Sequence, residues 1–135
     1  MDVFRTQGAF SWAELTTSDP AAAAEFYGKL LGWKVKDPDA AMGGYRVVNV
    51  GDASVAGITA PFPGAPGAPG APPVPPHWGS YVTVDQVDEV AARCTELGGK
   101  VLVPPMDIPS VGRMTVIQDP QGAVLNLISY VAGPT

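Results

Sequence analysis

Two side chains near the start of the chain, Trp12 and Glu14, have types that support ligand binding or catalysis. They lie two positions apart in an expected strand over residues 10–17, so both point to the same face of that strand. A carboxylate in an apolar surrounding can act as a general base or pair with a cationic ligand. The alternative is that Glu14 forms a structural ion pair with Arg46 or Arg113.

Alternation along the expected strands places several apolar side chains and one amide on the face that carries the indole. Such a surface is typical of the floor of a pocket for a planar or hydrophobic molecule. The alternative is that these side chains fill the core and leave no pocket. The set consists of Trp12, Tyr81, Val124, Asn126 and Ile128.

Three further side chains carry charged or reactive groups. Arg113 begins an expected strand over residues 113–118, where its guanidinium can bind a carboxylate or phosphate of a ligand or stay exposed at the strand end. His77 is the only histidine, and one histidine without companions cannot build a zinc site. Cys94, the only cysteine, lies on the apolar side of an expected helix, which favours a buried thiol over a nucleophile.

The elements that must position these residues occur twice. An offset of 66 residues superimposes the two halves without gaps, which indicates an internal duplication. The matched residues are Trp12 with Trp78, Thr17 with Thr83, Asp19 with Asp85, and Leu31-Gly32 with Leu97-Gly98. The same offset sets Ser80 against Glu14. Each half reads as a strand, a helix and three further strands, a βαβββ module.

Helix signals follow the first strand of each half. Asp19 and Pro20 predict a capped helix start, and Gly32 predicts its end. The apolar residues at helical spacing in this helix are Ala23, Phe26, Tyr27 and Leu30, and they predict the face that packs in the core. In the second half, either Asp85 or Asp88 is expected to cap the helix, and the apolar stripe consists of Val87, Val90, Ala91, Cys94 and Leu97.

A proline-rich connector over residues 61–76 separates the first module, residues 1–60, from the second, residues 77–135. Its sequence, PFPGAPGAPGAPPVPP, contains eight prolines and little bulky apolar mass. We therefore expect a polyproline-like or mobile spacer that tolerates deletion of residues 64–71. The alternative is a recognition segment for a proline-binding module.

The duplicated modules resemble the vicinal oxygen chelate superfamily, which groups glyoxalases, extradiol dioxygenases, fosfomycin-resistance proteins and bleomycin-binding proteins. The resemblance implies an α+β fold in which two βαβββ modules form a curved mixed eight-strand sheet around a concave cavity, with the helices outside. It rests on Asp19-Pro20, Phe26-Tyr27-Gly28, Leu30-Leu31-Gly32-Trp33, Asp85-Gln86-Val87-Asp88, Glu96-Leu97-Gly98-Gly99, Pro104-Pro105-Met106-Asp107-Ile108-Pro109 and Asp119-Pro120-Gln121-Gly122-Ala123-Val124-Leu125.

The resemblance also implies where a metal would bind. Metal-dependent members of that superfamily take four His, Glu or Gln ligands from equivalent strands of the two modules. In this chain those positions carry Trp12, Gly79, Asn126 and a residue within Ala56-Gly57-Ile58. Indole and glycine cannot coordinate a metal through a side chain, and a lone amide is a poor ligand. We therefore expect no metal and no other cofactor.

Composition excludes several classes of protein and partner. The 135 residues are 46% hydrophobic and 16% charged, with a net charge of −5, so disorder is not expected. The apolar runs are too short to span a membrane, no basic patch suggests nucleic acid, and residues 1–10 do not read as a signal peptide. We expect a cytoplasmic globular domain that binds neither nucleic acid nor membrane.

The resemblance and the missing ligands together predict a metal-free protein that binds a small organic molecule, either an aromatic or hydrophobic metabolite or an antibiotic. The alternative is an enzyme of the same superfamily, a lyase, isomerase or dioxygenase-like protein. In that case Glu14 is the one weak catalytic candidate, or a metal site lies at other residues. Because the sheet leaves open edges, we also expect a homodimer.

Overall fold

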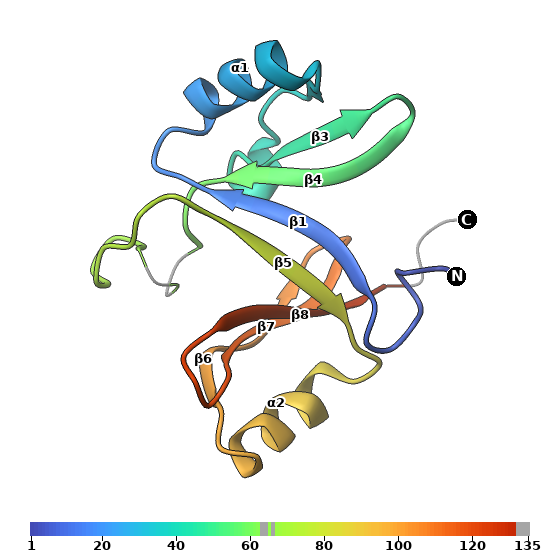
Figure 1. Ribbon diagram of the computed structural model, residues 1–135, viewed down its shortest axis with the longest axis vertical. Helices are drawn as coiled ribbons and strands as arrows, with labels where there is room; N and C mark the ends of the chain where they lie inside the picture. The colour runs from blue at the N-terminus through green and yellow to red at the C-terminus, as the bar shows by residue number, and fades with distance from the viewer. Residues whose placement is uncertain (63–64, 66, 132–135) are drawn as a thin grey trace. The chain divides into compact units, whose positions relative to one another are not determined.

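The structure, a computed structural model, describes residues 1–62, 65 and 67–131. These residues form two compact units, which are described separately (Figure 1). The first unit, Trp12–Gly79, is called module N. The second, called module C, combines Met1–Ser11 with the chain from Ser80 onward. The amino-terminal arm therefore belongs with the second repeat. Backbone bonds of 2.8 Å join Gly8 N to Thr83 O and Thr83 N to Ala9 O.

Module N contains the first βαβββ repeat. Its strands follow the order β2-β3-β4-β1, with β1 parallel to β4 and the other neighbours antiparallel. Its elements are β1 (Phe10–Thr16, whose first two residues belong to module C), α1 (Pro20–Leu31), β2 (Lys34–Val35), the 3-10 helix η1 (Ala40–Met42), β3 (Arg46–Val50) and β4 (Ala53–Thr59).

Module C contains the second repeat in the order β5-β8-β7-β6, with β5 parallel to β8. Its elements are β5 (His77–Thr83, which begins in module N), α2 (Val87–Glu96), β6 (Lys100–Ile108), β7 (Gly112–Gln118) and β8 (Val124–Tyr130). Within the described residues, the α+β class, the mixed pairing of eight strands and the two βαβββ repeats are confirmed. No helix in that part of the chain is both long enough and apolar enough to cross a membrane.

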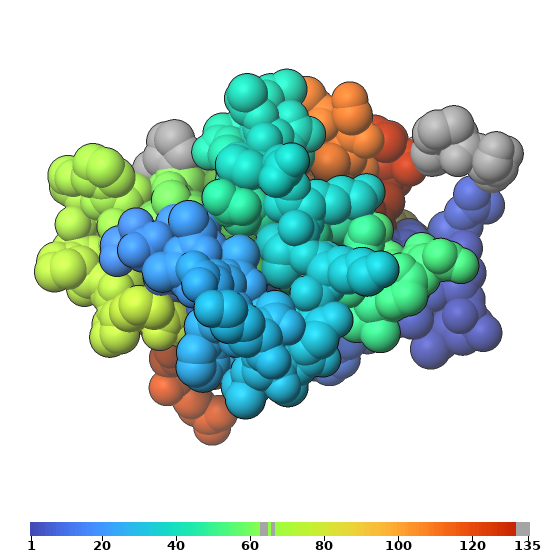
Figure 2. All heavy atoms as spheres, turned by 90° about the horizontal axis from the view of Figure 1, so that it is seen from above, coloured from blue at the N-terminus to red at the C-terminus, as the bar shows by residue number. Residues whose placement is uncertain are grey.

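Helix α1 begins and ends as the sequence predicts. The Asp19 carboxylate accepts a bond from Ala22 N at 3.0 Å, and Gly32 ends the helix with a φ of 74°. The prediction for its buried face is wrong at two positions, because Phe26 and Leu30 are 58% and 61% exposed. The residues that pack against the core of Leu15, Val48, Ala56 and Ile58 include Ala23, Ala24 and Tyr27. Figure 2 shows α1, in blue, on the visible surface.

Helix α2 departs from its predicted start. Its cap residue is Gln86, which makes no side-chain capping bond, so neither Asp85 nor Asp88 is the cap. Val87 and Ala91 are buried as expected, whereas Leu97 is 65% exposed.

In the first strands of the two repeats, the offset between corresponding residues differs from the 66 residues that the sequence suggests. Ala13 and Leu15 pack with the α1 core, whereas Val82 and Val84 pack with Val87 of α2. Leu15 therefore corresponds to Val82, an offset of 67. A shift of one residue turns every side chain to the other face of a strand.

This offset changes the expected partner of Glu14. Ser80 corresponds to Ala13, and Tyr81 takes the position of Glu14, so the alignment of Ser80 with Glu14 is wrong. After the helices the offset returns to 66, because Gly32 and Gly98 both have positive φ at the helix ends.

The described part of the connector is folded rather than extended. Ala65 and Ala68 are 8% and 3% exposed, and Gly67 N donates to Pro72 O at 2.9 Å. Gly67 has a φ of 87°, which lets the chain turn back so that Val74 lies against it. Small side chains allow this close packing, so the expectation of a polyproline-like or mobile spacer is not met at these residues. Positions 63, 64 and 66 lie outside the described residues.

Candidate functional site

Three side chains of module N form a hydrogen-bonded chain. The indole Nε1 of Trp12 donates to the Tyr45 hydroxyl at 2.8 Å, and that hydroxyl donates to Oε2 of Glu14 at 2.9 Å. Glu14 is only 4% exposed. Trp12 and Glu14 share the sheet face opposite α1, because their neighbours Ala13 and Leu15 pack with the α1 core. The expectation that these two side chains share a face is confirmed.

A tight turn before β3 brings Tyr45 to this place. The side chain of Asp39 caps η1 by accepting from Ala41 N at 3.0 Å. Gly43 and Gly44 follow with φ values of 68° and 90°, a conformation that suits glycine. Asp39 N then donates to Tyr45 O at 3.0 Å and closes the turn. Tyr45 lies one residue before β3 and reaches across the sheet from there.

Gly57 in β4 provides the space for the phenol. It is the Cα partner of Glu14 in β1 and of Val47 in β3. A β-carbon at Gly57 would overlap the hydroxyl and ring of Tyr45, and the three atoms nearest to it all belong to that side chain. The glycine is therefore required by the position of the tyrosine.

The arrangement of Trp12, Tyr45 and Glu14 suits two kinds of chemistry: stacking of a planar ligand on the indole, and proton transfer by the phenol and the carboxylate. Burying a carboxylate is costly unless hydrogen bonds compensate for the lost water, and the phenol supplies one such bond. The same phenol fixes the orientation of the indole, whose flat face is the part of Trp12 suited to stacking. A phenol in contact with a carboxylate is also a pair that can take up and release a proton.

Sequence reasoning missed Tyr45. The residues that bind it are 33 and 31 positions away, so no local pattern links them. Two signals were available: a Gly-Gly turn directly before a strand, and a lone glycine inside a strand, which often marks a close approach.

Module C brings two of the other candidates together. Tyr81 and Asn126 are Cα partners in neighbouring strands, and Tyr81 is 2% exposed. Leu125 and Leu127 pack with the core beside α2, so Asn126 lies on the opposite face of the sheet. Val124 shares that face by alternation, but it is 53% exposed at the strand end.

Arg113 lies on the other face, with α2. Its Nε and Nη2 bind the Asp88 carboxylate at 2.8 and 2.9 Å, and its Nη1 binds Asp107 at 3.0 Å. The hydrogen bonding of Arg113 to Asp88, together with the positive charge of the guanidinium, holds the pKa of Asp88 below its usual range. The same contacts raise the pKa of Arg113. The structure does not place Arg113 with Tyr81 and Asn126.

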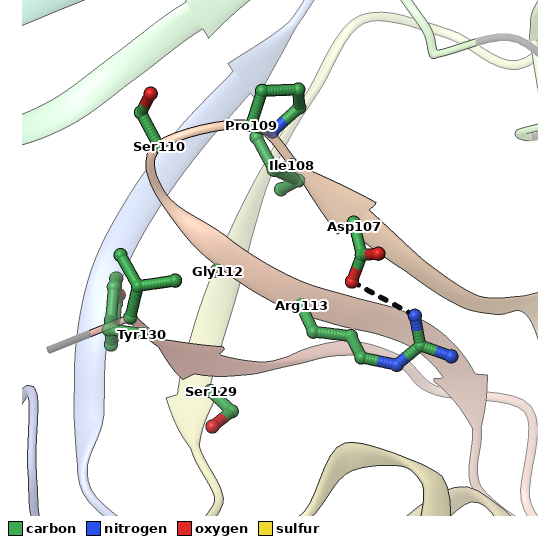
Figure 3. A pocket seen from close by; sticks show the side chains of 9 residues that line it. Asp107, Ile108, Pro109, Ser110, Gly112, Arg113, Ser129 and Tyr130 are labelled. Carbon is green, nitrogen blue, oxygen red and sulfur yellow. Dashed lines mark hydrogen bonds and ion pairs between the residues drawn. The ribbon is translucent and has the colours of Figure 1, made fainter.

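A surface cavity of about 370 Å³ lies beside this ion pair, at the β6–β7 hairpin. Figure 3 shows Asp107 and Arg113 reaching toward each other from neighbouring strands, with Ser110 at the turn. The guanidinium at this cavity is already bound to two carboxylates of the chain itself, so an anionic ligand would have to compete with them.

The two remaining candidates have structural contacts. His77 is exposed, and its Nδ1 lies 2.9 Å from Pro75 O. Cys94 is partly buried, with its Sγ 3.8 Å from Lys100 O. Among the described residues, no three His, Cys, Asp or Glu side chains gather where they could hold a metal ion.

Comparison with known proteins identifies the family. The family model "Glyoxalase/Bleomycin resistance protein/Dioxygenase superfamily" matches residues 9–127. The chain belongs to this superfamily. A superfamily relative, "Putative glyoxylase CFP32" of Mycobacterium bovis, is 41% identical over 123 residues, which cover 90% of this chain and 44% of the relative. The anthracycline biosynthesis protein DnrV of Streptomyces peucetius is 36% identical over 129 residues, covering 86% and 45%.

The superfamily fold is also found in solved structures. Methylmalonyl-CoA epimerase from Mycobacterium tuberculosis matches with a TM-score of 0.62 and 17% identity, covering 92% of this chain and 88% of that one. At this identity the likeness concerns the fold alone. The chain spans less than half the length of the curated relatives it matches.

The residues at the metal-ligand positions of the superfamily do not fit a metal. The strand pairing identifies Gly57 as the counterpart of Asn126, because Glu14 pairs with Gly57 as Tyr81 pairs with Asn126. With this correspondence, the four positions at which the resemblance implies metal ligands are Trp12, Gly57, Gly79 and Asn126. The indole N–H is a donor bound to Tyr45, the glycines have no side chain, and one amide oxygen is a weak ligand for transition metals.

Proposed function

We propose that this chain binds a planar polycyclic aromatic molecule, which stacks on Trp12 and turns its polar edge toward Glu14. The observation that carries the proposal is the bonded series of Trp12, Tyr45 and Glu14 on one sheet face. A ring that is already oriented loses little conformational freedom when a ligand binds. Aromatic stacking contributes about 0.5–1.5 kcal/mol beyond the burial of apolar area.

Two further observations support the ligand class. In module N, the positions at which the resemblance to the superfamily implies metal ligands carry an indole and two glycines, Trp12, Gly57 and Gly79, so an aromatic ring stands where a coordinating side chain would be. The relative DnrV is named for the biosynthesis of anthracyclines, which contain a planar anthraquinone. A planar ring system of this kind can stack on the face of an indole.

The test is a fluorescence titration with daunorubicin, an anthracycline whose chromophore reports binding directly. We expect saturable binding to the parent chain and its loss in Trp12→Ala, with the fold retained by circular dichroism. Trp78→Ala is the matched control, because the Trp78 indole also donates to a tyrosine, Tyr27 at 3.2 Å. A chelator should leave binding unchanged. Equal affinities for the parent and Trp12→Ala would refute the proposal.

Acid–base catalysis is the second candidate, favoured by the 2.9 Å bond between the Tyr45 hydroxyl and Glu14. In this case the bound molecule would give a proton to the Tyr45–Glu14 pair at one atom, take one back at another, and be released as an isomer. Mass spectrometry and chromatography of daunorubicin after incubation distinguish the two functions. Unchanged ligand supports binding alone. Conversion that Glu14→Gln abolishes while binding persists supports catalysis.

We further propose a homodimer. Helix α1 exposes three large apolar side chains: Phe26, Leu30 and Leu31 are 58%, 61% and 53% exposed. Three such side chains on one short helix form an apolar surface that another protein surface can cover. A second copy of the chain is the partner we propose for it.

A further inference from the structure

We infer that Tyr45 is the positioning residue of the proposed binding site. It holds the indole of Trp12 and the carboxylate of Glu14 in one fixed relation, and its phenol fills the space left by Gly57. The ligand-binding part of this inference rests on the proposed function. The structural part does not, and the experiments below separate the two.

The chemistry of the indole and the carboxylate calls for a linking group that both accepts and donates a hydrogen bond. An indole N–H only donates, and an ionised carboxylate only accepts. A group that links them must accept from the first and donate to the second, as the Tyr45 hydroxyl does at 2.8 and 2.9 Å. Phenylalanine at this position would fill the same volume but make neither bond.

The two modules differ at this position in a way that supports the inference. In module C the partner of Tyr81 is Asn126, which has a side chain. In module N the corresponding partner of Glu14 is Gly57, and the phenol of Tyr45 takes the space that a side chain there would need. In module N, the space beside Glu14 is thus filled by a side chain that follows the Gly43-Gly44 turn, and not by a side chain of the paired strand β4.

The bonds have a consequence for recognition. Because the indole N–H of Trp12 is already bound to Tyr45, the ligand meets the face of the ring rather than its polar edge. Loss of the tyrosine hydroxyl would let the indole rotate and would leave its N–H without this acceptor. Affinity then falls, although Tyr45 need not touch the ligand.

Tyr27 offers a matched control within the same module. Its hydroxyl accepts from the Trp78 indole at 3.2 Å, so the same kind of tryptophan–tyrosine bond exists there. Tyr27 belongs to a cluster with Trp33 and Trp78, beside α1, and not to the Glu14 site. Removal of its hydroxyl therefore tests whether any lost indole bond has the same effect.

The first experiment compares Tyr45→Phe with Tyr27→Phe by indole N–H NMR signals, daunorubicin affinity and thermal unfolding. For Tyr45→Phe we expect a shift of the Trp12 signal and an affinity lower by about tenfold, the scale of one hydrogen bond, with folding retained. For Tyr27→Phe we expect a shift of the Trp78 signal and unchanged affinity.

Two results would overturn the inference about Tyr45, and a third would overturn the proposed function. An unmoved Trp12 signal in Tyr45→Phe would overturn the inference, and so would an affinity unchanged from the parent. If the parent chain does not bind daunorubicin, the proposed function fails for this ligand class. In that event the NMR signals still decide whether Tyr45 positions the indole.

A second experiment uses Gly57 and is independent of any ligand. Gly57→Ala should lower the unfolding temperature strongly in the parent and only weakly in a Tyr45→Ala background, because the methyl group then has room. If Gly57→Ala alone fails to fold, recovery of folding in the double variant supports the inference. An equal loss in both backgrounds, or a double variant that stays unfolded while Tyr45→Ala folds, would contradict it.

Discussion

The phenol of Tyr45 lies over the α-carbon of Gly57, so closely that any side chain at residue 57 would collide with it. The two residues approach from neighbouring antiparallel strands, β3 and β4, with the tyrosine one position outside its strand. This contact lets one hydroxyl bind both Trp12 and Glu14. The candidate site of module N therefore depends on a glycine that itself offers no functional group.

The ion pair of module C makes stability depend on pH. Arg113 lowers the pKa of Asp88, so the stabilisation is complete above the unfolded-state value, about 3.9, and is lost as the pH falls through the lower folded-state pKa. We expect Asp88→Asn to unfold at a slightly lower temperature than the parent at neutral pH, with the difference vanishing in acid.

The effect should be small and reduced by salt, because the two side chains are 38% and 65% exposed. Asp52→Asn, at an exposed turn between β3 and β4, is the control. A difference between Asp88→Asn and the parent that grows as the pH falls would be inconsistent with this ion pair.

The connector should contribute to stability, contrary to the expectation from its composition. Ala68 is 3% exposed, so Ala68→Asp would bury a charge and should lower the unfolding temperature by about 10 °C or more. Pro73→Asp, at an exposed position, should have little effect. Deletion of residues 64–71 should destabilise the chain as well. If Ala68→Asp unfolds at the parental temperature, the connector does not pack as described.

The homodimer is tested by the mass of the particle in solution. Light scattering at micromolar concentration should give about twice the chain mass of 13.9 kDa. The pair of substitutions Phe26→Lys and Leu30→Lys should produce a monomer, because lysines cannot be buried in an apolar contact without partners. Ala21→Lys, exposed elsewhere on α1, should leave the dimer intact. A parent mass of 13.9 kDa would rule out the proposed dimer under these conditions.

Local signals explain how much of the fold the sequence predicts. Asp19, Pro20 and Gly32 determine the helix ends through contacts with residues close to them in sequence, so the ends of α1 could be predicted correctly. The error at Phe26 has a different origin: helical spacing indicates an apolar stripe but not how much of it the sheet covers. The offset of 66 residues between the two halves holds after the helices, but before them the offset is 67. For this reason the sequence alignment wrongly set Ser80, and not Tyr81, against Glu14.

The candidate site was predictable only in part. Trp12 and Glu14 follow from alternation within one strand, which the sequence shows directly. Tyr45 reaches them through a turn and across Gly57, and such a contact depends on strand pairing that the sequence does not show. Arg113 was a candidate for binding an anionic ligand, but its guanidinium binds Asp88 and Asp107, and the sequence does not show that Asp88 in α2 comes close to β7.

The most direct test of the account is an NMR titration of the parent chain with daunorubicin, observed at the three tryptophan indole N–H signals. The account predicts that the Trp12 signal moves in a saturable manner, while the signals of Trp33 and Trp78, which lie together in the aromatic cluster beside α1, remain in place. Movement of the Trp33 or Trp78 signal with an unchanged Trp12 signal would contradict it.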